Sequence, residues 1–135
     1  MSIQAVYDYI EAPGDVIKAR NELADQVCRD LELAGIPAFR QEGSPWDRAG
    51  AVVEANPSGD AAGGVFVEWN PHPTVSQAVA DSVQSGEFPA KVIQHSGVIS
   101  SCMRDAIIGI LESAGFQADA ADDDMRPMAV RVATG

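Results

Sequence analysis

The sequence is short of lysine, of cysteine and of long apolar runs, and each shortage excludes a class of protein. Lys18 and Lys91 are its only lysines, and 20 acidic residues face 9 basic ones, which leaves a formal net charge of −11 at pH 7. Such a charge repels nucleic-acid phosphates and anionic membrane surfaces, so neither is an expected partner. The acidic surface fits either a protein partner with a basic surface or a surface that only keeps the chain soluble.

The small number of cysteines points to a reducing compartment. Cys28 and Cys102 are too few for a disulfide framework and do not form a Cys-x-x-Cys pair. His72 and His95 do not stand at zinc-ligand spacing from either cysteine. No apolar run approaches the roughly 20 residues that span a bilayer, and the first residues lack the pattern of a signal peptide. We therefore expect a cytoplasmic protein with no metal and no cofactor.

The length of 135 residues suits one domain, over residues 1–135, and 46% apolar residues are enough for a core. Residues 15–34 predict a first long amphipathic helix, with Val27 and Leu31 on its apolar side. Asp15 is predicted to cap its start and Gly35 to end it in a left-handed conformation.

A second long helix is predicted to begin at Ser96 or Ser100 and to end at Gly115. Its apolar stripe is predicted to face the core and consists of Val98, Cys102, Ala106, Ile110 and Leu111, widened by Ile99, Met103 and Ile107.

Both cysteines are predicted to be structural. In the first turn of the second helix, the helix dipole would lower the pKa of the Cys102 thiol and favour a reactive cysteine. Cys102 nevertheless lies on the apolar stripe, and Cys28 stands beside Val27 and Leu31. Because free cysteines are among the most buried residues, we expect both thiols inside the core.

The two helices resemble each other at an offset of 80 positions. Leu31 and Leu111 each begin a Leu-Glu-x-Ala-Gly sequence that runs into a strand. One interpretation is an internal duplication that places both helices on one face of a pseudo-symmetric sheet. The alternative is that any amphipathic helix followed by a strand looks this way, and two copies are too few for a solenoid.

The remaining patterns complete an α+β fold. Alternating apolar residues and turn signals predict strands at residues 36–41, 51–55, 65–69, 116–120 and 128–133. A shorter helix is predicted at 75–84, with a capping box of Thr74 and Gln77. Residues 3–10 favour another short helix, with an added strand as the alternative, and 87–95 is predicted to be a linker. Short connections favour an antiparallel or mixed sheet of about five strands, with the two long helices on one face.

No catalytic constellation stands out. His72 lies between two prolines in a loop and could act as a general base if Glu68 or Asp81 oriented it. The sequence places no nucleophile beside it, so a rigid turn with a surface histidine is the simpler interpretation. His95 is predicted to belong to the linker.

Two loop features favour protein binding instead. Trp46 stands in a polar loop, where an exposed aromatic ring beside charges is typical of a binding hot spot, or where the ring folds back over the sheet edge. Asp122, Asp123 and Asp124 form the tip of a predicted hairpin, where they either discourage edge pairing or dock a basic partner. The run lacks the alternating ligands and the glycine of a calcium loop.

By elimination, the sequence predicts a non-catalytic protein-binding module of the immunity or inhibitor type. The residues expected to contact the partner are Trp46, His72 and the three aspartates 122–124. A small acidic secretion-type chaperone is one alternative, although such chaperones usually end in a helix and this chain is predicted to end in a strand. A small hydrolase or transferase that uses His72 with a carboxylate is the other.

Overall fold

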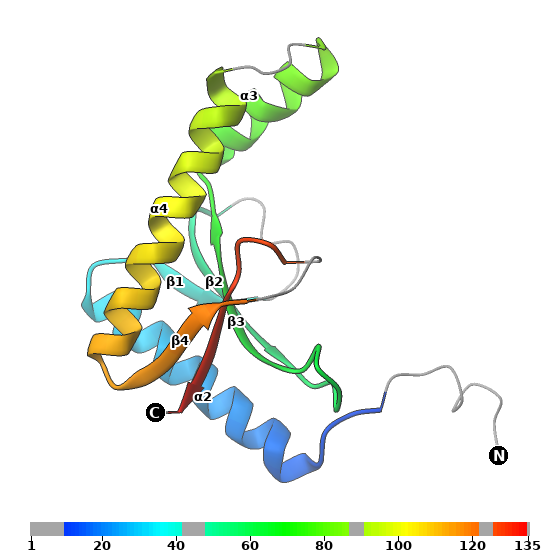
Figure 1. The fold of residues 1–135 in the computed structure, drawn as a ribbon, viewed down its shortest axis with the longest axis vertical. Coiled ribbons are helices and arrows are strands. Elements are labelled where there is room, and N and C mark those ends of the chain that lie inside the picture. Colours follow the sequence, from blue (N-terminus) through cyan, green and yellow to red (C-terminus); the bar gives the residue numbers. More distant parts are fainter. Residues whose placement is uncertain (1–9, 42–47, 87–90, 122–125, 135) are drawn as a thin grey trace, which may run out of the picture.

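A computed structural model describes residues 10–41, 48–86, 91–121 and 126–134 (Figure 1). The helices within these ranges are α2 (Gly14–Leu33), α3 (Pro73–Gln84) and α4 (Lys91–Ser113). The strands are β1 (Ala38–Arg40), β2 (Gly50–Asn56), β3 (Gly64–Asn70), β4 (Phe116–Ala120) and β5 (Val130–Thr134). The strands form one mixed sheet in the order β1-β2-β3-β5-β4, in which only the β1–β2 pair is parallel. The predicted α+β fold is confirmed.

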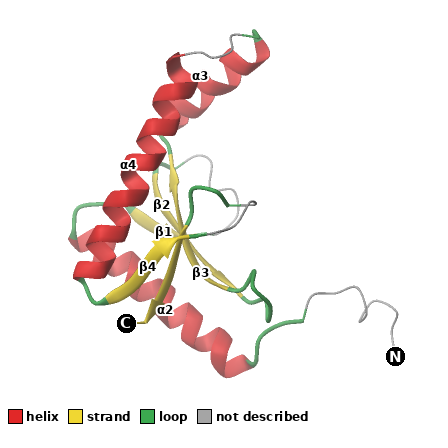
Figure 2. Ribbon diagram, in the orientation of Figure 1, coloured by secondary structure: helices red, strands yellow, loops and turns green. Residues whose placement is uncertain are grey.

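The main core lies between one face of the sheet and the helices α2 and α4 (Figure 2). Alternation along the strands sends Val53, Val65 and Val67 to this face, where they meet the apolar sides of both helices. Leu31 of α2 and Leu111 of α4 have no exposed surface. The prediction that both long helices cover one face of the sheet is therefore confirmed.

The two helix–strand units end alike. The backbone of Gly35 after α2 and of Gly115 after α4 has a φ of 89° and 99°, the left-handed region that glycine adopts without strain. Each glycine is followed by an edge strand, β1 in one unit and β4 in the other. The pattern at an offset of 80 positions thus marks two corresponding units at opposite edges of the sheet.

The helices α3 and α4 form an arm that extends beyond the sheet (Figure 1). No residue of α3 is buried, and the buried residues of α4, Ile107 and Leu111, both lie in its second half. The first part of α4 runs beside α3 (Figure 1), and the two helices are in contact. This arm is therefore stabilised mainly by its own helix pair.

The prediction for the second long helix was wrong in its start and right for only part of its core-facing stripe, since Ile107 and Leu111 are buried and Ile110 packs against the core. The helix begins at Lys91, so His95 lies inside α4 and not in a linker. Val98 is 58% exposed, and Cys102 and Ala106 are exposed as well. Because α4 is apolar on more than one side, periodicity alone did not identify which residues the sheet covers.

The prediction for the cysteines was right for Cys28 and wrong for Cys102. Cys28 is buried in the core, where burial raises the pKa of its thiol above the ordinary value, with the Arg40 charge acting in the opposite direction. Cys102 is exposed near the middle of α4, three turns after its first residue, and not at the helix N-terminus.

The helix starts also differ from the predicted caps. Pro13 is the N-cap of α2 and contributes no side-chain cap, so Asp15 lies in the first turn instead. His72 is the N-cap of α3, which replaces the predicted capping box of Thr74 and Gln77. The helix predicted at residues 3–10 falls almost entirely outside the described residues, and Ile10 at its end is 81% exposed.

Candidate functional surface

The face of the sheet opposite to α2 and α4, called the second face below, has aromatic rings covered by arginine side chains. Phe66 alternates with the core residues Val65 and Val67 and therefore points to this face, yet it is only 1% exposed. The guanidinium of Arg126 lies 4.1 Å from the centre of its ring, and that of Arg131 lies 5.0 Å away. Both distances are within cation–π range.

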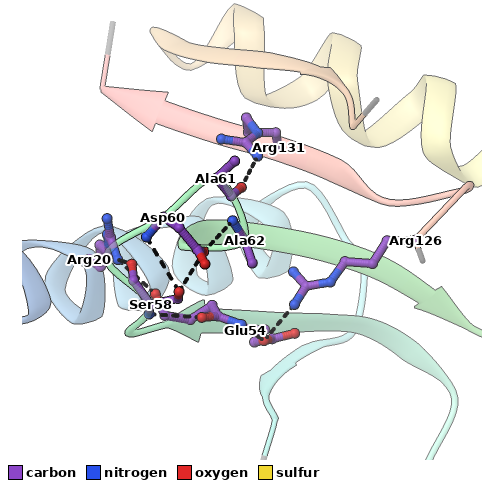
Figure 3. Close-up of polar contacts among 9 residues, drawn as sticks. Arg20, Glu54, Ser58, Asp60, Ala61, Ala62, Arg126 and Arg131 are labelled. Atoms are coloured by element: carbon purple, nitrogen blue, oxygen red, sulfur yellow. Dashed lines mark hydrogen bonds and ion pairs between the residues drawn. The ribbon is translucent and has the colours of Figure 1, made fainter. Parts of the chain in front are cut away.

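An ion pair fixes the position of Arg126. Its Nη2 atom donates to Oε1 of Glu54 on β2 at 3.1 Å, as Figure 3 shows. The same Oε1 accepts a hydrogen bond from Asn56 at 3.0 Å. The Nη1 atom of Arg126 is buried without a hydrogen-bond partner. A guanidinium in this setting is held by the ring and by one carboxylate, which leaves one donor unused.

A second arginine repeats this arrangement near the β1 edge. Arg48 places its guanidinium 4.3 Å from the centre of the Phe39 ring. Its backbone carbonyl accepts a hydrogen bond from the buried side chain of Asn70 at the end of β3. Phe39 pairs in register with Val52, which pairs with Glu68, so its ring belongs to the second face. The second face therefore has two separate arginine–phenylalanine stacks.

Four of the five predicted partner-binding residues cannot be placed. Trp46 and the aspartates 122–124 lie outside the described residues. The first described residue of the chain after 42–47 is Arg48, and the first after 122–125 is Arg126. Each segment is thus followed directly by an arginine that stacks on a ring of the second face.

The fifth predicted residue, His72, is described and exposed. Its Nδ1 atom accepts a hydrogen bond from the backbone amide of Thr74 at 3.1 Å, which caps the first turn of α3. Asp81, one of the two carboxylates considered as its partner, instead accepts a hydrogen bond from Gln77 at 2.9 Å. His72 therefore has a structural role at the start of the arm.

Sequence reasoning missed a polar turn between β2 and β3 (Figure 3). Arg20 of α2 donates through Nη1 to the carbonyl oxygens of Asn56 and Ser58, at 2.9 and 2.8 Å. The Ser58 hydroxyl lies 2.6 Å from the Asp60 carboxylate. Hydrogen bonds from Ser58 and from the Ala62 amide hold the pKa of Asp60 below its ordinary value. These hydrogen bonds fix the conformation of the turn between β2 and β3.

Two hollows adjoin these features. One, of about 280 Å³, lies where Trp69, Ser100 and Arg126 meet, and so joins the second face to the arm. The other, of about 480 Å³, lies between the first half of α2 and the β3–β5 end of the sheet, beside Arg20. In the described ranges no cluster of three or more histidine, cysteine or carboxylate side chains forms a metal site.

The signal for the arginine stacks is weak in the sequence, because each ring and its arginine lie on different elements. Seven of the nine basic residues are arginine, and this preference is the one hint, since a guanidinium stacks on rings more readily than an ammonium does.

No described helix is both long enough and apolar enough to cross a membrane. Comparisons with protein-family models, with curated proteins and with solved structures found no match.

Proposed function

We propose that this protein is a cytoplasmic, non-catalytic protein-binding module of the immunity or inhibitor type, which neutralises a partner with a basic surface. The net charge of −11 supports a basic partner, because opposite charges raise the rate of encounter and disfavour other ligands.

One observation carries the proposal. The segment with Trp46 and the segment with the three aspartates 122–124 are both followed by arginines, Arg48 and Arg126, that stack on rings of the second face. Arg48 and Arg126 thus lie on the same face of the sheet. An aromatic anchor combined with steering charges is typical of a tight interface that forms quickly.

The first experiment identifies the partner with matched baits. Wild-type protein and two variants, Trp46→Ala and the triple change of Asp122, Asp123 and Asp124 to Asn, are used to capture proteins from the native host at low salt. The control bait changes Asp15, Glu22 and Glu32 on the exposed side of α2 to Asn, Gln and Gln, which removes the same charge elsewhere. A basic protein held by wild type and control but lost from both variants supports the proposal. A partner that all four baits hold equally contradicts it.

The second experiment separates the roles of the two segments. The triple aspartate variant should slow association, and this effect should disappear as salt rises, because exposed charges are screened. Trp46→Ala should instead speed dissociation about 30-fold, which corresponds to a hot spot of about 2 kcal/mol. Unchanged rates in both variants, with folding intact, would mean that the interface lies elsewhere.

One feature favours the alternative of a small acidic secretion-type chaperone, namely that α2 precedes the sheet. That function is also protein binding, and it predicts a partner captured before it folds. A partner that is unfolded in the complex would favour the chaperone, whereas a folded and inhibited partner favours the immunity type.

A further inference from the structure

The side of α4 that points away from the sheet is mostly apolar, and the carboxylate of Asp105 on this side is paired with the side chain of Arg104 at 3.2 Å. Val98, Cys102, Ala106 and Gly109 follow one another at steps of four, four and three residues, so they share one face, called the outer face below. All four are exposed, and Val98 is 58% exposed. Self-repulsion in a chain with a net charge of −11 is smallest where a strip without net charge meets its own copy.

The charges at the two ends of α4 oppose the dipole of the helix. Lys91 is the first residue, at the positive end, and Glu112 lies in the last turn, at the negative end. The first turn has no acidic residue and the last turn has no basic one. Each end therefore carries a charge that its own helix disfavours and that an antiparallel helix would favour.

We propose that a second copy of this chain docks on the outer face, with the two α4 helices antiparallel. Cys102 is the midpoint of Lys91–Ser113. A two-fold axis at Cys102 sets Val98 opposite Ala106 of the second copy. It also brings Lys91 to the end that holds Glu112 of the second copy, so the end charges become complementary. A parallel pair would instead place the two lysines together.

The expected dimer is weak. A helix of 23 residues is about 35 Å long, and one helix from each copy buries less than the roughly 800 Å² per partner of a standard interface. Small side chains allow the two helices to approach closely, so the dimer is stabilised by close packing although the buried area is small. Self-association should therefore appear at micromolar concentrations and be absent at nanomolar ones.

Light scattering coupled to size exclusion, over a concentration series, tests the docking surface. Wild-type protein should shift from monomer to dimer mass as its concentration rises. Val98→Asp should stay monomeric at every concentration, because it places a charge in the strip. Ala80→Asp on the exposed side of α3 is the control and should dimerise like wild type. A short bismaleimide, which adds one thiol to each of its rings, should join two copies through Cys102 in the control but not in Val98→Asp.

A charge exchange tests the antiparallel direction. Lys91→Glu and Glu112→Lys each correct the charge at one helix end, so neither should destabilise the fold. Each should weaken the dimer about fivefold, whereas the double variant should return to within about twofold of wild type. A wild-type chain that is monomeric at millimolar concentration overturns the proposal. So does a dimer that Val98→Asp leaves intact, or a double variant without recovery.

Discussion

The two long helices share a local pattern but differ in what they cover. Both α2 and α4 bury a leucine at the same position, end at a left-handed glycine and lead into an edge strand. The helix α2 buries five residues, all between Leu23 and Leu31, whereas the longer α4 buries two, Ile107 and Leu111. The difference lies in the sheet, because the first half of α4 belongs to the arm that extends beyond it (Figure 1).

The same amphipathic pattern therefore packs a helix on the sheet in one place and leaves apolar residues beyond the sheet in another. An amphipathic helix needs a partner for its apolar side, and the sheet supplies it only where strands lie beneath. Past that point the apolar residues of α4 meet α3 on one side and solvent on the other. The exposed apolar surface there is the surface that the proposed second copy would cover.

The largest effect should come from the leucines that the two units share. Leu31→Ala and Leu111→Ala should each lower the free energy of unfolding by about 2–5 kcal/mol, because both side chains are fully buried. Leu33→Ala, at a position that is 79% exposed, is the control and should change it by less than about 0.5 kcal/mol. Urea unfolding measures all three. A large loss at Leu31 with little at Leu111 would show that α4 is not packed as α2 is.

The next effect concerns a clamp present only on α2. Arg20 holds the turn after β2 through two carbonyl oxygens, while the corresponding position of α4 is Ser100. Arg20→Ala should lower the free energy of unfolding by about 1–3 kcal/mol, because it removes two hydrogen bonds from a charged donor. Lys18→Ala on the exposed side of the same helix should cost little. If the two variants unfold at the same urea concentration, the clamp contributes nothing to stability.

The glycines that end the two helices should respond equally. Gly35→Ala and Gly115→Ala add a methyl group into open space, so strain comes only from the positive φ. Each substitution should lower the free energy of unfolding by about 1–2 kcal/mol, because alanine is strained in the left-handed conformation. Thermal unfolding of the two variants checks this equality. A loss of stability in only one of the variants would show that the two helix–strand units do not end alike.

Local signals explain what the sequence could predict. The glycine stops, the strand at 116–120 and the shared leucines depend on neighbours in the chain, and the structure has them as predicted. Which residues of the predicted stripe of α4 are buried could not be predicted, because Cys102 and Ile107 look equally apolar until the end of the sheet is known. The arginine stacks depend on contacts between distant segments, which no periodicity records.

The smallest effect is a pH dependence from Cys28. Burial raises its pKa above 9.0 in the folded chain, so the folded state holds the thiol proton more tightly than the unfolded state does. The stability that this group contributes is complete below pH 9.0 and is lost as the pH rises through the folded pKa. The urea midpoint of wild type should therefore fall more steeply with rising pH above that value than the midpoint of Cys28→Ala does. Parallel curves would mean that Cys28 is solvated.

The central claim is that the outer face of α4 is free in one chain and covered by a second. The rates at which the two thiols react with a maleimide, measured over a range of protein concentrations, test it directly. Cys28 should react only as fast as the chain unfolds, at every concentration. Cys102 should react quickly in dilute protein and more slowly as the dimer forms. A Cys102 rate that is slow even in dilute protein, or that does not change with concentration, would contradict the account.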